Sequence, residues 1–269
     1  MNPKVILLYG YGINCEEETA YFFHQAGADT DIVHINDLID GKKTLLDYQI
    51  MAFPGGFSYG DDTGSGNAYA NKMRNNLWPA VLEFVQGDKL VIGICNGCQI
   101  LVNLGLVPGL KGAYGDRKLA MMHNTSARYE CRWVDIKNTS KKCVWTRGID
   151  ILHCPVSHGE GRFYAEKDVA DALIAGDQIA FKYVKPDGSP ADGQFPFNPN
   201  GAILDSAAIC DETGRILAIM PHSERNSKFH HENDWTLLKE AAIREGKEHP
   251  EKGPGMKLFE NAVSYFTAK

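Results

Sequence analysis

Residues 90–104 restrict the folds open to this chain more than any other segment. An apolar, β-branched run ends at Gly93, and a helix-like apolar stretch follows from Gln99 to Leu104. Between them lies the pattern Gly93-x-Cys95-x-Gly97. Small residues on both sides of a nucleophile, between a strand and a helix, are typical of the elbow that raises a catalytic side chain above a sheet. The segment therefore predicts a βα unit with a reactive thiol at its turn.

The first hundred residues repeat this alternation of strand and helix. The expected strands are residues 5–9, 30–35, 50–53 and 90–94, and the expected helices are residues 16–26, 38–48 and 67–85, with a break or kink at Pro79. Such alternation indicates βαβ units, and hence an α/β fold with a mostly parallel central sheet flanked by helices. Ligands on such sheets bind beyond the carboxyl ends of the strands.

The second half of the chain is richer in strands. Strand-like segments occupy residues 128–136, 151–156 and 178–184, and a Pro/Gly/Asp-rich loop covers residues 185–200. Residues 202–209 and 215–220 flank a turn and predict a β-hairpin extension. Because no convincing linker interrupts the chain, we expect one domain over residues 1–269. Its tail, at about 229–269, resembles an insertion that ends in a last helix at 256–266.

Composition excludes several classes of partner. The 269 residues carry a net charge of −6 without a long Lys/Arg block, so nucleic acid is not an expected partner. The longest apolar runs are strand-sized, so no membrane association is expected. Seven cysteines, an odd number, favour a reduced, cytoplasmic protein over a disulfide scaffold. Apart from Cys95, we expect the cysteines to be small buried apolar residues.

A base for the Cys95 thiol can be chosen from the sequence. His222 follows the strand expected at 215–220, so its imidazole could reach the same sheet edge, and Glu224 stands two residues further on. In an extended segment these two side chains project the same way, so the carboxylate could orient the imidazole. A helix N-terminus favours the thiolate of Cys95. Cys95, His222 and Glu224 therefore form a candidate triad, although a solvated His-x-Glu turn is the commoner structure for that pair alone.

Two further clusters could contact a ligand. The backbone N–H of Asn96 and a donor from the turn at 54–57 could bind an oxyanion, although an ordinary turn would also explain the glycines there. The alternating segment His158-Gly159-Glu160-Gly161-Arg162 is either a ligand-contacting loop or a polar turn.

Two other functions stay open at this point. Cys95-x-x-Cys98 matches a dithiol redox motif, which would give His222 and the flanking glycines no role. A non-catalytic scaffold on the same fold is the other alternative. We expect no metal site, because no second Cys-x-x-Cys exists and His230-His231-Glu232 has no partner at ligand spacing. We expect these three residues to be solvated.

Seven motifs together resemble one family. They are Gly12-x-Asn14-Cys15-Glu16, Phe53-Pro54-Gly55-Gly56-Phe57-Ser58-Tyr59-Gly60-Asp61-Asp62, Gly93-Ile94-Cys95-Asn96-Gly97, Asn124-x-Ser126 with Cys131-Arg132-Trp133-Val134, His158-Gly159-Glu160-Gly161-Arg162-Phe163, Asn198-Pro199-Asn200-Gly201 and Met220-Pro221-His222-x-Glu224-Arg225. In this order they resemble the class I, triad-type glutamine amidotransferases, with a flavodoxin-like fold, and more narrowly the glutaminase subunits of phosphoribosylformylglycinamidine synthase.

The resemblance implies a role for each residue. Cys95 would attack the side-chain amide of glutamine, and His222, oriented by Glu224, would protonate the departing ammonia. Gly56 and Asn96 would form the oxyanion hole, and Gly55, Phe57 and Gln99 would contact the substrate. Ammonia would pass to a separate ATP-dependent synthetase subunit in purine biosynthesis, with a small third subunit bridging the two.

The same resemblance places the cofactors elsewhere. ATP and Mg would bind the synthetase, and this chain would need no cofactor. The loop at 185–200 and the turn with His158, Glu160 and Arg162 are candidate docking surfaces. Two departures from the family stand out: Ser223 replaces a usual proline, and residues 229–255 form an insertion.

Overall fold

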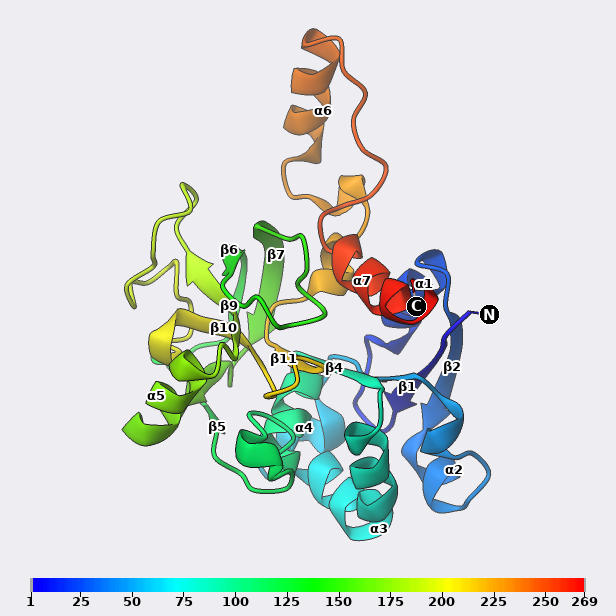
Figure 1. Cartoon of the computed structure of the whole chain (residues 1–269). Coiled ribbons are helices and arrows are strands. Elements are labelled where there is room, and N and C mark those ends of the chain that lie inside the picture. The colour runs from blue at the N-terminus through cyan, green and yellow to red at the C-terminus, as the bar shows by residue number, and fades with distance from the viewer. Residues whose placement is uncertain (1, 269) are drawn as a thin grey trace.

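A nine-stranded mixed sheet forms the centre of the protein in a computed structural model that describes residues 2–268 (Figure 1). In spatial order its strands are β2 (Asp29–His34), β1 (Lys4–Tyr9), β3 (Ile50–Phe53), β4 (Leu90–Ile94), β11 (Ile216–Ile219), β10 (Ser206–Cys210), β9 (Ile179–Val184), β6 (Glu130–Asn138) and β7 (Ile151–His158). A separate two-stranded sheet joins β5 (Ala120–Met122) to β8 (Arg162–Tyr164).

The first five strands in that order are parallel, and the remaining neighbours are antiparallel. Every residue of β3, β4 and β11 is buried. Uninterrupted apolar strands are expected where helices cover both faces of a parallel sheet. The predicted α/β fold with a central parallel sheet is therefore confirmed.

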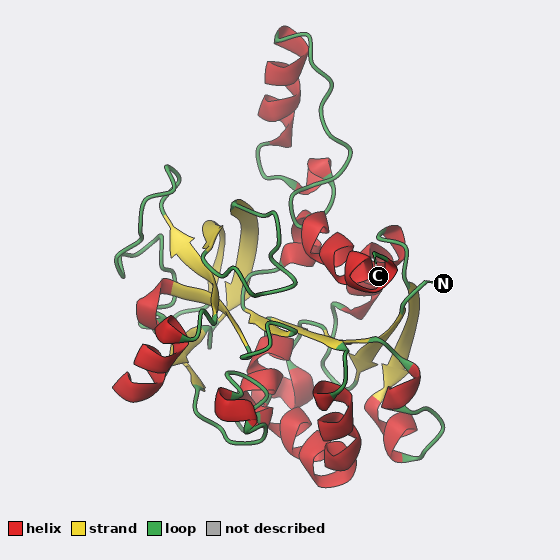
Figure 2. Cartoon of the chain, viewed as in Figure 1, coloured by secondary structure: helices red, strands yellow, loops and turns green. Residues whose placement is uncertain are grey.

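Helices cover both faces of the parallel half (Figures 1 and 2). The helices of the described chain are α1 (Glu16–Gln25), α2 (Ile35–Ile39), α3 (Asn67–Gln86), α4 (Asn96–Leu104), α5 (Lys167–Ala175), α6 (Trp235–Arg244) and α7 (Met256–Thr267), of which α5 lies beside the antiparallel half and α6 covers neither face. α1 and α7 pack together on one face, where the rings of Phe23 and Phe259 lie 4.9 Å apart. α3 and α4 pack on the other face. None of the helices in residues 2–268 has both the length and the apolar character that crossing a bilayer requires.

The predicted hairpin exists, and its place decides where the candidate site forms. β10 and β11 pair antiparallel, and β11 then pairs parallel with β4. The hairpin thus lies inside the sheet and not at its edge. Since β4 precedes Cys95 and β11 precedes His222, two residues distant in sequence leave the sheet from neighbouring strands.

One predicted helix is wrong. Residues 38–48 do not form a continuous helix: α2 ends at Ile39, and a short 3-10 helix covers Leu45–Asp47. Gly41 adopts φ +73°, which ends the helix, and the Thr44 hydroxyl accepts from the N–H of Leu46 to begin the next turn. By contrast, α3 runs from Asn67 to Gln86 with Pro79 inside it.

The tail contains the last helix expected there, α7, and a further helix, α6. α6 projects away from the rest of the protein (Figure 2), and none of its side chains is buried. The expectation that His230-His231-Glu232 is solvated is wrong for Glu232, which is buried and accepts from the Asn226 amide at 2.9 Å. That the whole chain is one domain, with an insertion at about 229–269, stays a prediction.

Candidate active site

Cys95 occupies a strained turn between β4 and α4. Its φ is +53°, which is rare for a residue with a side chain, and its N–H donates to the carbonyl of Ile219 at 2.9 Å. A Cβ on Gly93 would lie 2.4 Å from the carbonyl oxygen of Gly97. A Cβ on Gly97 would lie 1.9 Å from the carbonyl oxygen of Phe53. The two glycines are therefore required by close backbone packing, as the elbow pattern predicts.

Replacing Gly97 with alanine should lower the free energy of unfolding by about 3 kcal/mol or more, because the new methyl group must displace backbone. Gly41→Ala is the control for a glycine without a close approach: Gly41 has a positive φ, unlike Gly97, but no atom lies within 4 Å of the place its new methyl group would take. It should cost about 1 kcal/mol from backbone strain alone. Denaturant unfolding of both variants measures the difference, and equal losses would contradict the close-approach explanation.

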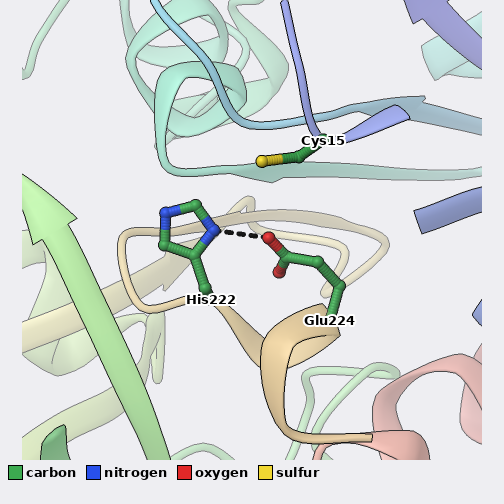
Figure 3. Close-up of side chains that lie close together, drawn as sticks. All are labelled: Cys15, His222 and Glu224. Atoms are coloured by element: carbon green, nitrogen blue, oxygen red, sulfur yellow. Dashed lines mark hydrogen bonds and ion pairs between the residues drawn. The ribbon is translucent and has the colours of Figure 1, made fainter. Parts of the chain in front are cut away.

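His222 and Glu224 form a buried pair at the end of β11 (Figure 3). The Nδ1 atom of His222 shares a hydrogen bond with Oε1 of Glu224, and the backbone N–H of His222 donates to the carbonyl of Pro155 at 2.8 Å. Ser223–Asn226 is a 3-10 helix, so the expected extended segment is wrong. The predicted contact between the two side chains nevertheless forms, because the tight turn brings the carboxylate back onto the ring.

The charge balance of this pair favours a protonated imidazole. Burial lowers the pKa of His222, but the carboxylate of Glu224 and the sulfur of Cys95 together leave that pKa well above its usual value. The remaining ring nitrogen, Nε2, is buried without a partner in the described chain. His222 therefore has a proton to donate and a nitrogen free to exchange it.

Cys95 and His222 meet around Gly55. A Cβ built on Gly55 would lie 2.9 Å from Cε1 of His222, 3.2 Å from the sulfur of Cys15 and 3.5 Å from Cβ of Cys95. The missing side chain thus leaves the space in which the three side chains approach one another. The sulfur of Cys95 lies 3.6 Å from the carbonyl of Ser157, and the residue is 5 % exposed in all.

Cys15 is a residue whose place sequence reasoning missed. It was expected to be a buried apolar residue, but its sulfur accepts from the Arg225 guanidinium at 3.2 Å and lies beside the His222–Glu224 pair (Figure 3). Donor atoms of Cys15, His222 and Glu224 lie within 4.8 Å of one another, a set that could hold a metal ion. Since two of these atoms already bond each other and a guanidinium faces the third, the hydrogen-bonded arrangement fits better.

The prediction that Cys131 is buried is wrong. Cys131 is exposed, because it lies on the outward face of β6 opposite Ser157. Strand alternation, which the surrounding residues showed, could have predicted this. Cys98 is fully buried in α4, as expected.

The two predicted oxyanion donors lie on adjacent turns. Gly56 adopts φ +150°, and a Cβ there would lie 2.5 Å from the carbonyl oxygen of Gly12. Asn96 begins α4, directly after Cys95. Within residues 2–268, neither backbone N–H donates a hydrogen bond to another residue. Both donors are therefore available to a ligand, which is what an oxyanion hole requires.

A cavity of about 280 Å³ opens beside Cys95. It is lined by Gly56, Phe57, Asp61, Ser65, Cys95, Gln99, His123, Tyr129, Ser157, His158, Gly159 and Glu160. Phe57 is 45 % exposed at this cavity, and its ring lies 6.3 Å from that of Tyr129. A larger cavity of about 570 Å³, at the base of the tail near Phe229 and Trp235, has no cysteine among the residues that line it.

Of the three residues predicted to contact the substrate, Phe57 and Gln99 line this cavity and Gly55 does not. Gln99 lies on its wall, where its amide nitrogen donates to the carbonyl of Glu160 and its oxygen accepts from Asn96, both at 2.8 Å. Gly55 lies behind the wall, between Cys95 and His222. That these residues contact substrate stays a prediction.

Not all of the side chains predicted to contact a ligand from residues 158–162 line the cavity. His158 and Glu160 line the cavity, but Arg162 does not; its guanidinium lies 3.7 Å from the sulfur of Met122 instead. Burial and then the charge of His222 lower the pKa of His158 to about 4, so its imidazole is neutral. Because Asn124 Oδ1 already accepts from Gly161 N–H, Nδ1 of His158 donates to it at 3.2 Å, which leaves Nε2 as an acceptor.

Comparison with known proteins first gives the class. A model of the CobB/CobQ-like glutamine amidotransferase domain matches residues 2–266. The chain is also similar to a chain in a structure of PurLQS from Thermotoga maritima, with a TM-score of 0.70 and 26% identity, covering 99% of this chain and 100% of that one.

Relatives of higher identity indicate which family of glutamine amidotransferases the chain belongs to. Phosphoribosylformylglycinamidine synthase subunit PurQ of Methanococcus maripaludis is 54% identical over 98% of this chain and 97% of its own length. The PurQ subunit of Dehalococcoides mccartyi is 41% identical over 97% of each chain. The chain therefore belongs to the PurQ family of glutamine amidotransferases.

Proposed function

We propose that this chain hydrolyses glutamine to glutamate and ammonia through a thioester on Cys95, and that it does so as the glutaminase subunit of a phosphoribosylformylglycinamidine synthase. The observation that carries the proposal is the meeting of Cys95 with the His222–Glu224 pair around Gly55. The 54% identity to a PurQ subunit over nearly the whole of both chains supports the same function.

Acylation follows from the positions of the groups. The sulfur of Cys95 attacks the carboxamide carbon of glutamine, and the electron pair of the C=O bond moves to oxygen, where the N–H groups of Gly56 and Asn96 stabilise it. The imidazolium of His222 then protonates the amide nitrogen. The C–N bond breaks, ammonia departs, and a glutamyl thioester and neutral His222 remain.

Deacylation reverses the proton transfer. Neutral His222 takes a proton from water, and the resulting hydroxide attacks the thioester carbonyl, whose oxygen again accepts from Gly56 and Asn96. The C–S bond breaks, glutamate departs and the thiolate–imidazolium pair returns. Glu224 holds the imidazole in one orientation and stabilises its positive charge through both steps.

The ammonia is delivered to an ATP-dependent synthetase subunit, which makes formylglycinamidine ribonucleotide, and a small third subunit bridges the two proteins. The similarity to a chain of PurLQS supports this assembly. ATP and Mg bind the synthetase, and this chain contributes no cofactor site. Co-purification in the presence of glutamine and nucleotide tests the assembly, and elution of this chain without a synthetase would contradict it.

A dithiol redox function is the competing proposal, and the structure offers it little support. The Cys98 thiol is fully buried in α4, and burial raises its pKa well above the usual value, which disfavours the thiolate needed for exchange. Cys98→Ala should therefore retain glutamine-dependent synthesis within about threefold. Steady-state rates of the reconstituted complex measure this. A loss comparable to that of a Cys95 variant would favour the redox function.

The remaining alternative is a scaffold without catalysis. Incubation of the complex with a glutamine-like electrophile, followed by mass spectrometry of the peptide that contains Cys95, distinguishes a scaffold from a glutaminase. Adduct formation on Cys95 supports the glutaminase, and an unmodified Cys95 in the full complex supports the scaffold.

A further inference from the structure

The thiol of Cys15 is a buried group beside the candidate triad that the proposed mechanism does not use. The residue is 1% exposed, and its sulfur lies within 4.8 Å of a ring nitrogen of His222 and of a carboxylate oxygen of Glu224 (Figure 3). Cys15 directly precedes α1, whereas the pair lies beyond β11. A side chain from the first turn after β1 therefore lies against the pair that the last strand of the sheet supplies.

Two hydrogen bonds fix the orientation of this thiol. Its S–H donates to Oδ1 of Asn14 at 3.4 Å, and the sulfur accepts from the guanidinium of Arg225 at 3.2 Å. Burial raises the pKa of the Cys15 thiol, so it keeps its proton at neutral pH. Because that proton points to Asn14, the sulfur presents lone pairs to Arg225 and to the imidazole of His222.

The backbone of Cys15 is held in place as firmly as its side chain. Its N–H donates to the carbonyl of Gly55 at 3.2 Å, and its carbonyl accepts from the N–H of Thr19, also at 3.2 Å. A Cβ built on Gly55 would lie 3.2 Å from the sulfur and 2.9 Å from Cε1 of His222. The sulfur thus has a fixed place near the Cε1 edge of the ring, and it cannot move without disturbing the turn at Gly55.

The sulfur contacts both ends of the short turn that carries the catalytic pair. This turn begins after His222 and includes Arg225, whose N–H donates to the carbonyl of His222 at 3.3 Å. Cys15 binds the guanidinium at one end and lies beside the imidazole at the other. Since Glu224 already bonds Nδ1, these contacts leave Nε2 as the ring nitrogen without a partner in the described chain.

We propose that Cys15 is a positioning residue for the reaction, which holds the His222 imidazole, together with Glu224, in the orientation that leaves Nε2 free for proton transfer. This inference rests on the proposed glutaminase function. Burial lowers the pKa of His222, and Glu224, Cys95 and then Cys15 raise it, so the Cys15 sulfur also stabilises the imidazolium. Cys15 touches no reacting atom in this scheme and acts through His222.

The test compares Cys15→Ala with Cys15→Ser, which differ by one oxygen that can replace both hydrogen bonds of the thiol. In the reconstituted complex, Cys15→Ala should lower kcat for glutamine about 10- to 100-fold with KM within about threefold of the wild type. Because the sulfur raises the pKa of His222, its loss should also move the alkaline limb of the kcat profile to lower pH. Cys15→Ser should keep kcat within about threefold of the wild type and keep its pH profile.

Cys143→Ala is the matched control, since Cys143 is also 1% exposed but lies outside the Cys95 cavity. It should leave kcat and the pH profile unchanged, even if it lowers Tm as much as Cys15→Ala does. An unchanged kcat in Cys15→Ala would overturn the proposal. A Cys15→Ser variant that lost as much as Cys15→Ala would also overturn it, because the loss would then come from packing and not from the hydrogen bonds.

Synthesis from ammonium salts by each preparation reports assembly of the complex. If Cys15→Ala did not assemble, Cys15→Val, which fills the space but accepts no hydrogen bond, takes its place with the same expected loss of kcat. A wild-type complex that used ammonium salts but never glutamine would contradict the glutaminase function itself. Normal use of glutamine by the wild type and by all Cys15 variants would contradict the positioning role alone.

Discussion

Replacing Cys95 with alanine should lower glutamine-dependent synthesis by the reconstituted complex at least about ten-thousandfold, because the proposed mechanism forms the thioester on the Cys95 sulfur. Synthesis from added ammonium salts should stay at the wild-type rate, since that route needs no amide hydrolysis. Both rates are measured on the same preparation, with glutamine or with ammonium chloride as the nitrogen source.

The matched control for this experiment is Cys131→Ala. Cys131 is exposed on β6 and lies outside the Cys95 cavity, so its loss should change neither rate. If the Cys95→Ala complex still used glutamine, the thioester mechanism would be wrong. Loss of both activities in that variant would instead indicate a failure of assembly, which co-purification with the synthetase would reveal.

The second large effect is expected from Glu224→Gln, which keeps the shape of the side chain but removes its charge. The carboxylate raises the pKa of His222 against the effect of burial, so its removal should lower that pKa. In the proposed mechanism, the imidazolium of His222 is the acid that releases ammonia. The alkaline limb of the kcat profile should therefore move to lower pH, and kcat at its optimum should fall about a thousandfold.

A pH series of glutaminase rates, taken at saturating glutamine, measures both changes. Glu232→Gln is the control, since Glu232 is also a buried glutamate of this segment but bonds Asn226 and not His222. Its profile should match that of the wild type. A Glu224→Gln profile with an unmoved alkaline limb would exclude Glu224 as the source of the raised pKa.

The elbow could be predicted from sequence because its causes are local. Gly93 and Gly97 are needed where the turn meets its own backbone and that of Phe53, and the apolar run before them is a fully buried strand. His222 could be placed by the same argument, from the end of a strand in an α/β sheet. The contact between His222 and Glu224 was also predicted, but for an extended segment. The structure has a 3-10 turn there instead.

What sequence reasoning missed depends on contacts between distant segments. Cys15 follows an ordinary turn after β1, and its place beside His222 arises only when that turn meets the one at Gly55. Asp61 belongs to a Gly/Asp-rich loop, and nothing local shows that Ser65 joins it to Glu160. The helix expected at 38–48 failed for a local reason, because Gly41 adopts positive φ.

The position of β11 between β4 and β10 has a consequence for protein synthesis. A nascent chain that has left the ribosome as far as residue 205 already carries the reactive sulfur but has neither the imidazole nor the strand that aligns it. We therefore expect copies that end before β11 to hydrolyse no glutamine, because the last strand to enter the middle of the sheet is also the one that brings His222 to Cys95.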